Sequence, residues 1–361
     1  MRSVIVSVGN ALNVLEHYPG EVFDHKMFDL RSLNLDELQQ NSVDVAGYIQ
    51  KICVLCFCGG RYPDLNLSMF DLVIILDEEV LPGDPDQYLQ LVQTKFSNTN
   101  IKIICSGYHK NYQLDTDSIY VYPYFLQNIL RYNRPQKINS VQTHDRSFDA
   151  LLGGVKRHRK VIFNKLGQHT MLDACYVNLT TSAGSAAPVK TIYRTPELDD
   201  LEFGSTTPIM INQGFNGYVE LEPGIRIAYI VPWAVYQKSL YSIIAETNFE
   251  NNFFFTEKTA KALYAQRPFV FFGAHLQLEE LRRLGFKTFD SVIDESYDLI
   301  KDTEQRFDCA FEQVAQLFRQ NYHTVYEKLQ PVLEHNSTHI QNRQYFLTPL
   351  NQWLNKYFQT C

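Results

Sequence analysis

The 361-residue chain has no apolar run close to the roughly 20 residues that cross a bilayer. Its start, Met-Arg-Ser-Val-Ile-Val-Ser-Val, soon gives way to Gly, Asn and Glu, unlike a signal peptide. Positive charge is not in excess either, because 33 Lys and Arg stand against 40 Asp and Glu, a net charge of -7. We therefore expect a cytoplasmic protein without a membrane span, and the charge argues against non-specific nucleic-acid binding.

The chain also lacks a disulfide framework. It has seven cysteines, an odd number, and most of them stand in apolar segments, which is typical of buried, reduced thiols. Hydrophobic residues make up 45% of the sequence and charged residues 20%, which is ordinary for a globular protein. The length is about two to three times the usual domain size, so we expect more than one packed unit.

Short β-rich runs alternate with helix-compatible segments in the N-terminal part of the chain, as in a parallel sheet that is buried on both faces. The same alternation returns further along. The predicted strands are 3–8, 52–57, 72–76, 101–105, 148–152, 241–245 and 269–272, and helices are predicted over 161–166, 256–266 and 276–284.

Two features divide the chain. Residues 132–147 are polar without sustained periodicity, which is typical of a linker. Beyond Asp302 the pattern is helical, with interruptions near Pro331 and at Asn336-Ser337. We predict an α/β fold of two Rossmann-like domains followed by a helical C-terminal tail. The predicted domains are 1–145 and 146–302, and the tail is 303–361.

One segment of the second half carries the clearest chemistry. Thr256 is a good N-cap, and Ala260 and Leu263 belong to one apolar helix face. Lys258 then falls in the first turn, where the helix dipole disfavours an exposed cation by about 0.3–1 kcal/mol. Either an anion such as a phosphate lies there, bound by backbone N–H groups and the ammonium, or the lysine is simply a solvated surface residue.

Two carboxylates belong to the same region. Glu246 follows the run Ser242-Ile-Ile-Ala at the carboxyl end of a predicted strand, where open parallel sheets bind ligands. Glu257 directly precedes Lys258. Either carboxylate can accept hydrogen bonds from the two hydroxyls of a ribose, or can serve as a helix cap or a solvated group.

A second basic site lies upstream, where Gly153-Gly154 and the cluster Lys156 to Lys160 mark a predicted strand-to-helix turn. Within it, Arg157 and Arg159 can each donate two parallel hydrogen bonds to phosphate oxygens, although a solvated basic patch is the alternative. The chain has no Walker loop and no Gly-x-Gly-x-x-Gly, which weakens kinase-type and dinucleotide interpretations. Two helix starts with cations and two carboxylates predict a pocket for a nucleoside diphosphate.

These residues resemble the donor-binding signature of the α-1,3-fucosyltransferase family and related glycosyltransferases of the two-Rossmann type called GT-B. The residues that carry the resemblance are Glu246-Thr-Asn, Thr256-Glu257-Lys258 and Pro268-Phe-Val-Phe-Phe-Gly273. In addition, residues 159–173 are similar to the family's Arg-x-x-x-Phe-x-x-Leu…Val-Asp stretch.

The resemblance implies a set of roles. Arg159 and Lys258 would hold the diphosphate of a nucleotide sugar. Glu246 and Glu257 would hold its ribose and neighbouring groups. The family usually has Tyr where this chain has Phe254, so one hydroxyl that faces the donor is missing. The domain 146–302 would bind the donor and 1–145 the acceptor.

A weaker match lies in the first half, at Cys58-Gly-Gly-Arg-Tyr-Pro-Asp. Aligned on Pro63-Asp64, the family's catalytic Glu falls on Gly59, which cannot accept a proton. Asp77, at the end of the predicted strand 72–76, is then the first candidate for the general base, followed by Asp64; each is equally suited to a helix cap or a solvated turn. A metal is not expected to be required, because the two Asp-x-Asp triplets stand in contexts typical of turns.

We therefore expect a glycosyltransferase that moves a sugar from a nucleotide-diphosphate sugar to a glycan or other acceptor hydroxyl. A GDP-fucose-like donor is among the options, and the resemblance implies inversion. Two alternatives stay open. One is a non-catalytic protein that binds nucleotide sugars or glycans, as Gly59 suggests. The other is a transferase that modifies DNA bases, like some viral enzymes, against which the acidic charge balance argues.

Overall fold

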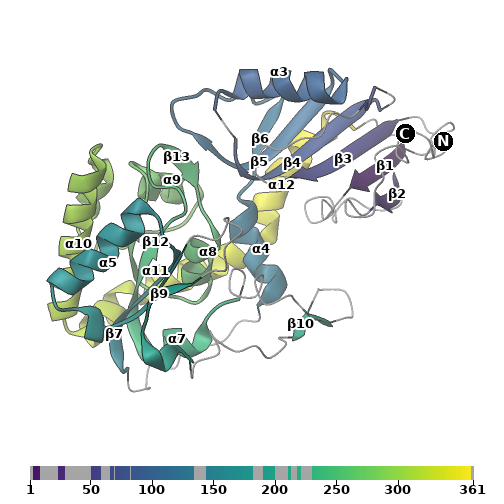
Figure 1. Cartoon of the computed structure of the whole chain (residues 1–361). Helices are drawn as coiled ribbons and strands as arrows, with labels where there is room; N and C mark the ends of the chain where they lie inside the picture. Colours follow the sequence, from purple (N-terminus) through teal and green to yellow (C-terminus); the bar gives the residue numbers. More distant parts are fainter. Residues whose placement is uncertain are drawn as a thin grey trace. The chain divides into compact units, whose positions relative to one another are not determined.

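The computed structural model describes most of the chain, in segments. They are residues 3–8, 23–28, 50–57, 66–68, 70–81, 83–133, 144–181, 190–199, 210–212, 218–220 and 230–358. The chain forms two compact units, which Figure 1 shows coloured along the sequence. Unit 1 comprises Met1–Tyr124 and Arg343–Cys361, and unit 2 comprises Phe125–Asn342.

Unit 1 contains a parallel sheet built from the β-rich runs of the N-terminal part. Its strands lie in the order β2-β1-β3-β4-β5-β6, and each pairs in parallel with its neighbour. Their bounds are β1 Ser3–Val8, β2 Phe23–Phe28, β3 Lys51–Phe57, β4 Leu72–Val80, β5 Ile101–His109 and β6 Ile119–Val121. Buried apolar runs in β3, β4 and β5 form the core of the unit, as expected for a sheet covered on both faces.

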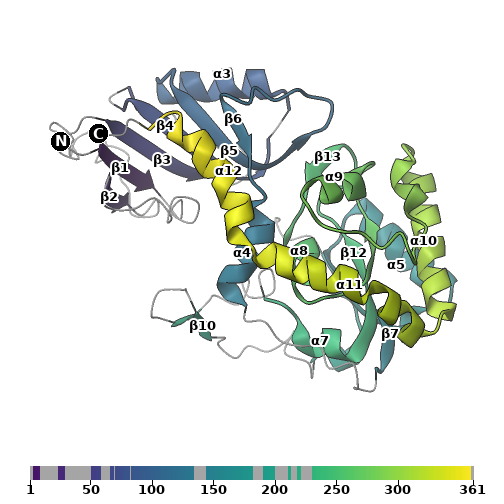
Figure 2. The ribbon, with the colours of Figure 1, turned by 180° about the vertical axis from the view of Figure 1, so that it is seen from behind.

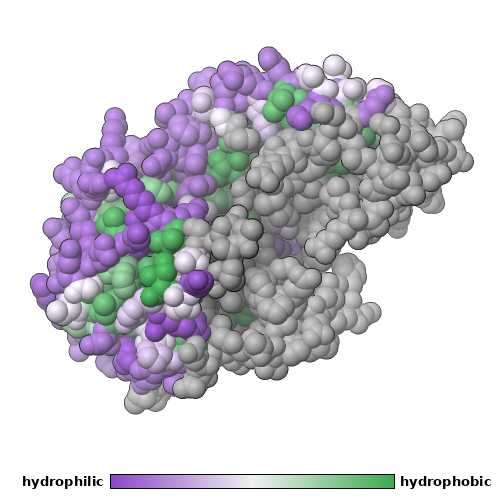
Figure 3. Space-filling view, in the orientation of Figure 1, coloured by the Kyte–Doolittle hydropathy of each residue, from purple (hydrophilic) through white to green (hydrophobic). Residues whose placement is uncertain are grey.

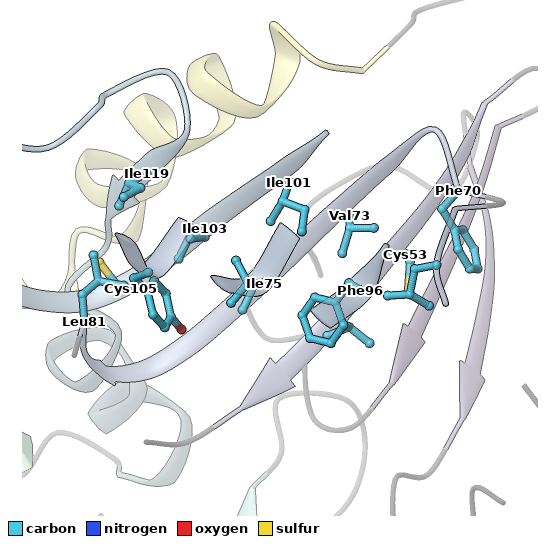
Figure 4. Packing of buried hydrophobic residues seen from close by; sticks show 14 residues of the cluster. Cys53, Phe70, Val73, Ile75, Leu81, Phe96, Ile101, Ile103, Cys105 and Ile119 are labelled. Carbon is cyan, nitrogen blue, oxygen red and sulfur yellow. The ribbon is translucent and has the colours of Figure 1, made fainter. Parts of the chain in front are cut away.

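Helices cover the two faces of this sheet. Helix α3, Pro85–Phe96, begins at the N-cap Asp84, whose carboxylate accepts hydrogen bonds from two backbone N–H groups. Its buried side packs on one face, and α12, Arg343–Asn355, crosses the other (Figure 1 and Figure 2). Figure 4 shows the core cluster on this face, where alternate residues of neighbouring strands lie on the same side of the sheet, together with Phe96 from α3. It includes Cys53, Val73, Ile75, Phe96, Ile101 and Ile103.

The C-terminal segment belongs to unit 1 through specific contacts. The indole N–H of Trp353 donates to the carbonyl oxygen of Thr116 at 2.6 Å. Gln50 Nε2 donates to the carbonyl oxygen of Tyr357 at 2.8 Å, and the ammonium of Lys102 lies 4.1 Å from the centre of the Tyr357 ring. The two hydrogen bonds join residues 237 and 307 positions apart, so the end of the chain completes a unit that begins at its start.

Unit 2 contains a second sheet, in the order β14-β12-β7-β8-β9. The first four strands run parallel, and β9 pairs antiparallel at the edge. Their bounds are β7 Arg146–Gly154, β8 Cys175–Thr180, β9 Thr191–Arg194, β12 Ser239–Ala245 and β14 Phe269–Phe272. Shorter strands are β10 Met210–Asn212 and β11 Tyr218–Glu220, which pair with each other, and β13 Asn252–Phe254.

Helices connect and cover the strands of unit 2. They are α4 Tyr124–Tyr132, which starts at the unit boundary, α5 Arg157–Gln168, α7 Trp233–Lys238, α8 Glu257–Tyr264, α9 Gln277–Arg283, α10 Thr303–Arg319 and α11 Tyr322–Gln341. Helices α5 and α10 lie side by side (Figure 1) and are joined by the ion pairs Arg157–Glu304 and Lys165–Asp308.

The α/β character and the parallel sheets that the sequence predicts are present. Strands β1 and β14 have the predicted bounds. Strands β4 and β5 run further than predicted, because the polar residues after their apolar runs still pair, with Asp77 opposite Cys105 and Val80 opposite Gly107. Strand β2, which has charged residues in its middle, was not predicted at all.

The compact units differ from the predicted domains. The chain passes from unit 1 to unit 2 between Tyr124 and Phe125, not near residue 145, and returns between Asn342 and Arg343. The predicted tail is therefore not one body, since α10 and α11 belong to unit 2 and α12 to unit 1. Most of the predicted linker, residues 134–143, lies outside the described residues.

The predicted interruptions of the tail are wrong for α11, which runs without a break through Pro331. Asn336 and Ser337 do not end the helix, because their polar groups have partners on other segments. The Asn336 amide bonds both the N–H and the carbonyl oxygen of Lys287, each at 2.8 Å, and Ser337 Oγ donates to the carbonyl oxygen of Tyr264 at 3.0 Å. Polar residues that look like helix breakers are thus used for tertiary contacts.

The surface of the described residues is mostly hydrophilic on the face seen in Figure 3, with separate hydrophobic areas between. Within the described part of the chain, no helix is both long enough and apolar enough to cross a membrane. Cys53, Cys105 and Cys175 are buried thiols without a disulfide, and burial raises the pKa of Cys53 to about 12.

A buried ion pair ties β7 to the region of β12. Arg267 Nη2 donates to Asp149 Oδ2 at 2.8 Å, and both side chains are almost fully buried. The same carboxylate oxygen accepts hydrogen bonds from the hydroxyls of Ser239 and Ser242 at 3.0 and 2.8 Å. Removing one partner of such a pair leaves an uncompensated charge inside the protein.

Replacing Arg267 by Met is therefore expected to lower the free energy of unfolding by about 3–5 kcal/mol. The matched control is Arg157→Ala, because the Arg157–Glu304 pair is 73% and 74% exposed and should contribute only about 0–1 kcal/mol. Urea unfolding followed by circular dichroism measures both. Equal losses in the two variants would contradict the structural role of Arg267.

Candidate functional site

Two parallel strands of unit 2 end side by side, and two helices start at that edge of the sheet. Strand β7 ends at Gly154 and β12 at Ala245, directly before Glu246. The two strands pair in parallel, with Ser242 opposite Asp149. Helix α5 follows β7, and α8 follows β12 after the short β13. The carboxyl edge of a parallel sheet is the usual place for a ligand in such folds.

Glycine is needed at the end of β7. Gly153 has a φ of 67°, in the left-handed region, and the pairing of β7 with β8 shifts register at this point. The turn leaves the carbonyl oxygen of Gly154 to accept a hydrogen bond from Arg159 Nη1 at 2.7 Å. The Gly-Gly pair thus holds the arginine of the following helix.

The carboxylate of Glu246 joins the end of β12 to the start of α8. The residue is fully buried, and each carboxylate oxygen accepts two hydrogen bonds. Oε1 accepts from Thr256 N at 3.0 Å and from the Thr259 hydroxyl. Oε2 accepts from Thr247 N at 3.0 Å and from Thr256 Oγ1 at 2.6 Å. The hydrogen-bonding capacity of Glu246 is therefore used inside unit 2.

His158 is packed beneath this edge. Its Nε2 lies 2.7 Å from the carbonyl oxygen of Glu246, so this nitrogen carries the proton and donates it. The ring stacks on Phe249, with ring centres 4.2 Å apart. Burial, and then the charge of Arg159, lower the pKa of His158 to about 3, which keeps the ring neutral at physiological pH. Its Nδ1 is buried and has no hydrogen-bond partner among the described residues.

Two further side chains hold the loop after β12. Lys156 Nζ donates to the carbonyl oxygen of Thr247 at 3.0 Å, and Arg306 Nη2 donates to that of Phe249 at 3.0 Å. Arg306 is itself buried and also donates from Nε to the carbonyl oxygen of Gly273, at the end of β14. Contacts from α10 and from the start of α5 therefore fix this loop.

Arg159 keeps one edge of its guanidinium unused. The residue is 5% exposed, and Nη1 bonds Gly154, but Nε is buried and donates to no atom of the described residues. Nε and Nη2 together form an edge that can donate two parallel hydrogen bonds to phosphate or carboxylate oxygens. Burial lowers the pKa of the Arg159 guanidinium, whereas the charges of Glu246 and Glu257 act to raise it. The guanidinium stays charged. A buried donor without a partner costs roughly 1–3 kcal/mol, which makes this edge the candidate binding position of unit 2.

Lys258 and Glu257 form an ion pair at the first turn of α8. Lys258 Nζ lies 2.9 Å from Glu257 Oε1 and also donates to the hydroxyls of Thr247 and Thr256 at 3.1 and 3.3 Å. One turn further, Lys261 is buried, and burial lowers the pKa of its ammonium to about 8, although Glu257 opposes the shift. Burial would raise the pKa of Glu257, but Lys258 and Lys261 outweigh it and hold that pKa below its usual value.

The structure brings most of the predicted donor site to one edge. The residues that lie together there are Arg159, Glu246, Thr256, Glu257 and Lys258. Arg157 pairs with Glu304 on the surface instead, because residues two positions apart on a helix point in nearly opposite directions. Phe254 is 3% exposed and packs edge-on against Phe125 with ring centres 5.5 Å apart, which makes it a core residue here.

The two predicted catalytic carboxylates have different outcomes. Asp77 lies within β4, not at its end, and is 2% exposed. Its carboxylate accepts a hydrogen bond from the hydroxyl of Tyr88 at 3.0 Å. Asp64 and Gly59 lie outside the described residues. The role of Asp77 as general base stays a prediction.

Sequence reasoning missed Lys261 and His158. Lys261 follows Glu257 by four positions, a spacing that places the two side chains together on a helix. His158, Ile162 and Leu166 recur at the same spacing and share the buried face of α5, but the surrounding basic residues hid this pattern. Assigning each residue to a face of its predicted helix would have identified both residues.

Lys261→Met is expected to stabilise the chain at pH 7. The ammonium has its pKa lowered from 10.5 to about 8, so the folded state is charged at pH 7 at a cost. Between about pH 8 and 10.5 the unfolded chain binds more protons than the folded one, so wild-type stability should rise with pH in that window. Removing the buried charge should add about 1–3 kcal/mol at pH 7.

Urea unfolding at pH 7 and pH 10 measures this, and the gain of Lys261→Met should be smaller at pH 10. Lys160→Met, at an exposed position of α5, is the control and should change stability little at either pH. A Lys261→Met chain that is less stable than the wild type at pH 7 would show that the ammonium is held by favourable contacts instead.

Chemically, this edge can bind an anion that carries several oxygens, between the unused guanidinium edge of Arg159 and the start of α8. In the described part of the chain, no three His, Cys, Asp or Glu side chains gather as a metal site requires. No model of a known protein family and no curated protein sequence matches the chain.

Proposed function

We propose that unit 2 binds a nucleotide-diphosphate sugar and that the chain transfers the sugar to an acceptor hydroxyl. The observation that carries this proposal is the unused edge of Arg159, whose Nε is buried without a partner among the described residues. It lies at the carboxyl edge of the sheet, close to the carboxylates of Glu246 and Glu257. A phosphate group that accepts from Nε and Nη2 would satisfy this donor.

The charges at this edge suit a departing diphosphate. Arg159, Lys258 and Lys261 provide three positive charges, and the first-turn N–H groups of α8 add the positive end of a helix dipole. In glycosyl transfer, negative charge develops on the leaving diphosphate, and preorganised cations stabilise it. The same groups would bind the donor and lower the barrier.

Glu257 is the better candidate for the ribose. Each oxygen of Glu246 already accepts two hydrogen bonds from unit 2, which leaves it no capacity for the hydroxyls of a ligand. The Glu257 side chain is 17% exposed and shares one oxygen with Lys258. We therefore assign the ribose hydroxyls to Glu257 and a structural role to Glu246.

The resemblance to α-1,3-fucosyltransferases supports the finer parts of the proposal. They are a GT-B arrangement of two Rossmann-like domains, a GDP-fucose-like donor, inversion at the sugar carbon and an acceptor bound by unit 1. In unit 1, Asp77 is the candidate for the base that removes the proton of the acceptor hydroxyl.

Calorimetry with GDP-, UDP-, ADP- and CDP-sugars tests the proposal directly. One nucleotide sugar of the panel should bind at millimolar concentrations or below. When a suitable acceptor is added, the sugar should be transferred and the nucleoside diphosphate released. If none of the four binds at millimolar concentration, the proposal is wrong.

Arg159→Ala should weaken donor binding by about 10- to 100-fold, the contribution of a charge-assisted pair of hydrogen bonds. Arg157→Ala is the matched control, because it removes an arginine two positions away that pairs with Glu304 on the surface. The affinity of the Arg157→Ala variant for the donor should stay within about twofold of the wild-type affinity. Equal weakening in both variants would indicate a diffuse basic patch in place of the site.

Asp77→Asn separates catalysis from binding. If Asp77 is the base, transfer should fall by about 100-fold or more while donor affinity stays unchanged, since general base catalysis contributes roughly 10²–10⁴-fold. Tyr88→Phe, which removes the hydroxyl that bonds Asp77, should leave donor affinity unchanged as well. Unchanged transfer by Asp77→Asn would exclude Asp77 as the base.

A second candidate is a nucleotide-sugar-binding protein without transferase activity. The burial of Asp77 and its bond to Tyr88 favour it, because they keep this carboxylate away from an acceptor. Donor binding without release of nucleoside diphosphate, with or without acceptors, would support this candidate over the transferase.

A further inference from the structure

We infer that Glu257 makes this site selective for nucleotides over free inorganic phosphate and pyrophosphate. The inference rests on the proposed function, because it concerns the same site in unit 2. It starts from the partners of Lys258, the cation at the first turn of α8.

Lys258 is not a freely available cation. Its ammonium lies 2.9 Å from Glu257 Oε1 and donates to two threonine hydroxyls. The side chains of the pair are only 20% and 17% exposed, so water screens the pair less than it would on an open surface. An anion that binds to Lys258 must therefore share or displace the carboxylate.

Glu257 also feels the other cations of the site. The charges of Lys258 and Lys261 lower its pKa, and the charge of Glu257 acts in turn on Arg159 and Lys261. The carboxylate thus stands among three cations and neutralises part of their field. It acts as an internal counter-ion at the place where a phosphate would be attracted.

The two carboxylates of the site differ in their freedom to change partners. Glu246 is fixed by four hydrogen bonds from Thr247, Thr256 and Thr259. Glu257 stands at the first position of α8; its ion pair is with the adjacent Lys258, and the charge of Lys261 on the same helix also acts on it. Glu257 is therefore the carboxylate that can exchange one partner for another.

This exchange distinguishes two classes of ligand. Phosphate and pyrophosphate are anions at neutral pH and carry no ribose, so they compete with Glu257 for Lys258 and repel the carboxylate that they displace. A nucleotide brings ribose hydroxyls as well, and these can donate hydrogen bonds to the same carboxylate. The nucleotide compensates Glu257 for the lost ion pair with two neutral hydroxyl donors, whereas an inorganic anion adds negative charge beside the carboxylate, and this difference gives selectivity against inorganic anions.

Glu257→Gln tests the inference, since it removes the charge and keeps the shape of the side chain. Calorimetry measures the affinity of the whole chain for pyrophosphate and for GDP, UDP, ADP and CDP. We expect pyrophosphate to bind about tenfold more tightly to the variant, as a like charge is removed from a partly buried site. The best nucleoside diphosphate should gain no affinity, because its ribose exchanges a charged acceptor for the weaker, neutral amide oxygen of glutamine.

Glu304→Gln is the control, because it removes a carboxylate that pairs with an arginine at the start of α5 on the exposed surface. The Glu304→Gln substitution should change neither the affinity for pyrophosphate nor the affinity for nucleoside diphosphates. Glu257→Ala, with circular dichroism to check folding, should show the same gain for pyrophosphate as Glu257→Gln.

The outcomes separate this inference from the proposed function. Binding of a nucleoside diphosphate to the wild type, with no gain of pyrophosphate affinity in either Glu257 variant, overturns only the selectivity. An equal gain for pyrophosphate and nucleoside diphosphate overturns it too, since the carboxylate would then merely repel anions. Absence of binding by every probe to every variant overturns the proposed function and the inference with it.

Discussion

The site in unit 2 depends on one buried carboxylate. Glu246 is fully buried and accepts four hydrogen bonds, three of them from the threonines that begin α8 and one from the loop that follows β12. A carboxylate in such a place is stable only while these donors converge on it. The first turn of α8, and with it Lys258, is therefore fixed relative to the strand end, while His158 bonds the carbonyl of the same residue. A single residue thus aligns two helix starts.

Much of the fold could be predicted from the sequence because its strands are apolar and its helices have clear ends. Thr256, which caps α8, and Gly285, with φ of 91° after α9, mark boundaries that follow from local chemistry. The division into units could not be predicted, because it is decided by what α12 packs against. Trp353 in α12 and Tyr357 just after it look like ordinary aromatic residues in the sequence, and their partners are far away along the chain.

The site was predictable in its charges but not in its geometry. Lys258, Arg159 and the two glutamates have residue types and spacings that suit a nucleoside diphosphate. Sequence alone could not distinguish Glu246, which is occupied by threonine donors, from Glu257, which is paired with a lysine. It also treated Arg157 and Arg159 alike, whereas one is on the surface and one is buried. Burial and hydrogen-bond occupancy, which residue types do not reveal, separate these roles.

The discontinuous make-up of unit 1 has a consequence for how the chain is made. During synthesis the N-terminal sheet emerges long before α12, which supplies the cover for one of its faces. Domains usually fold in order from the N-terminus as they leave the ribosome. Here unit 2, which is continuous, can complete itself first, while the face of the sheet that α12 crosses gains this helix only after unit 2 has been translated. The order of completion is thus reversed relative to the order of translation.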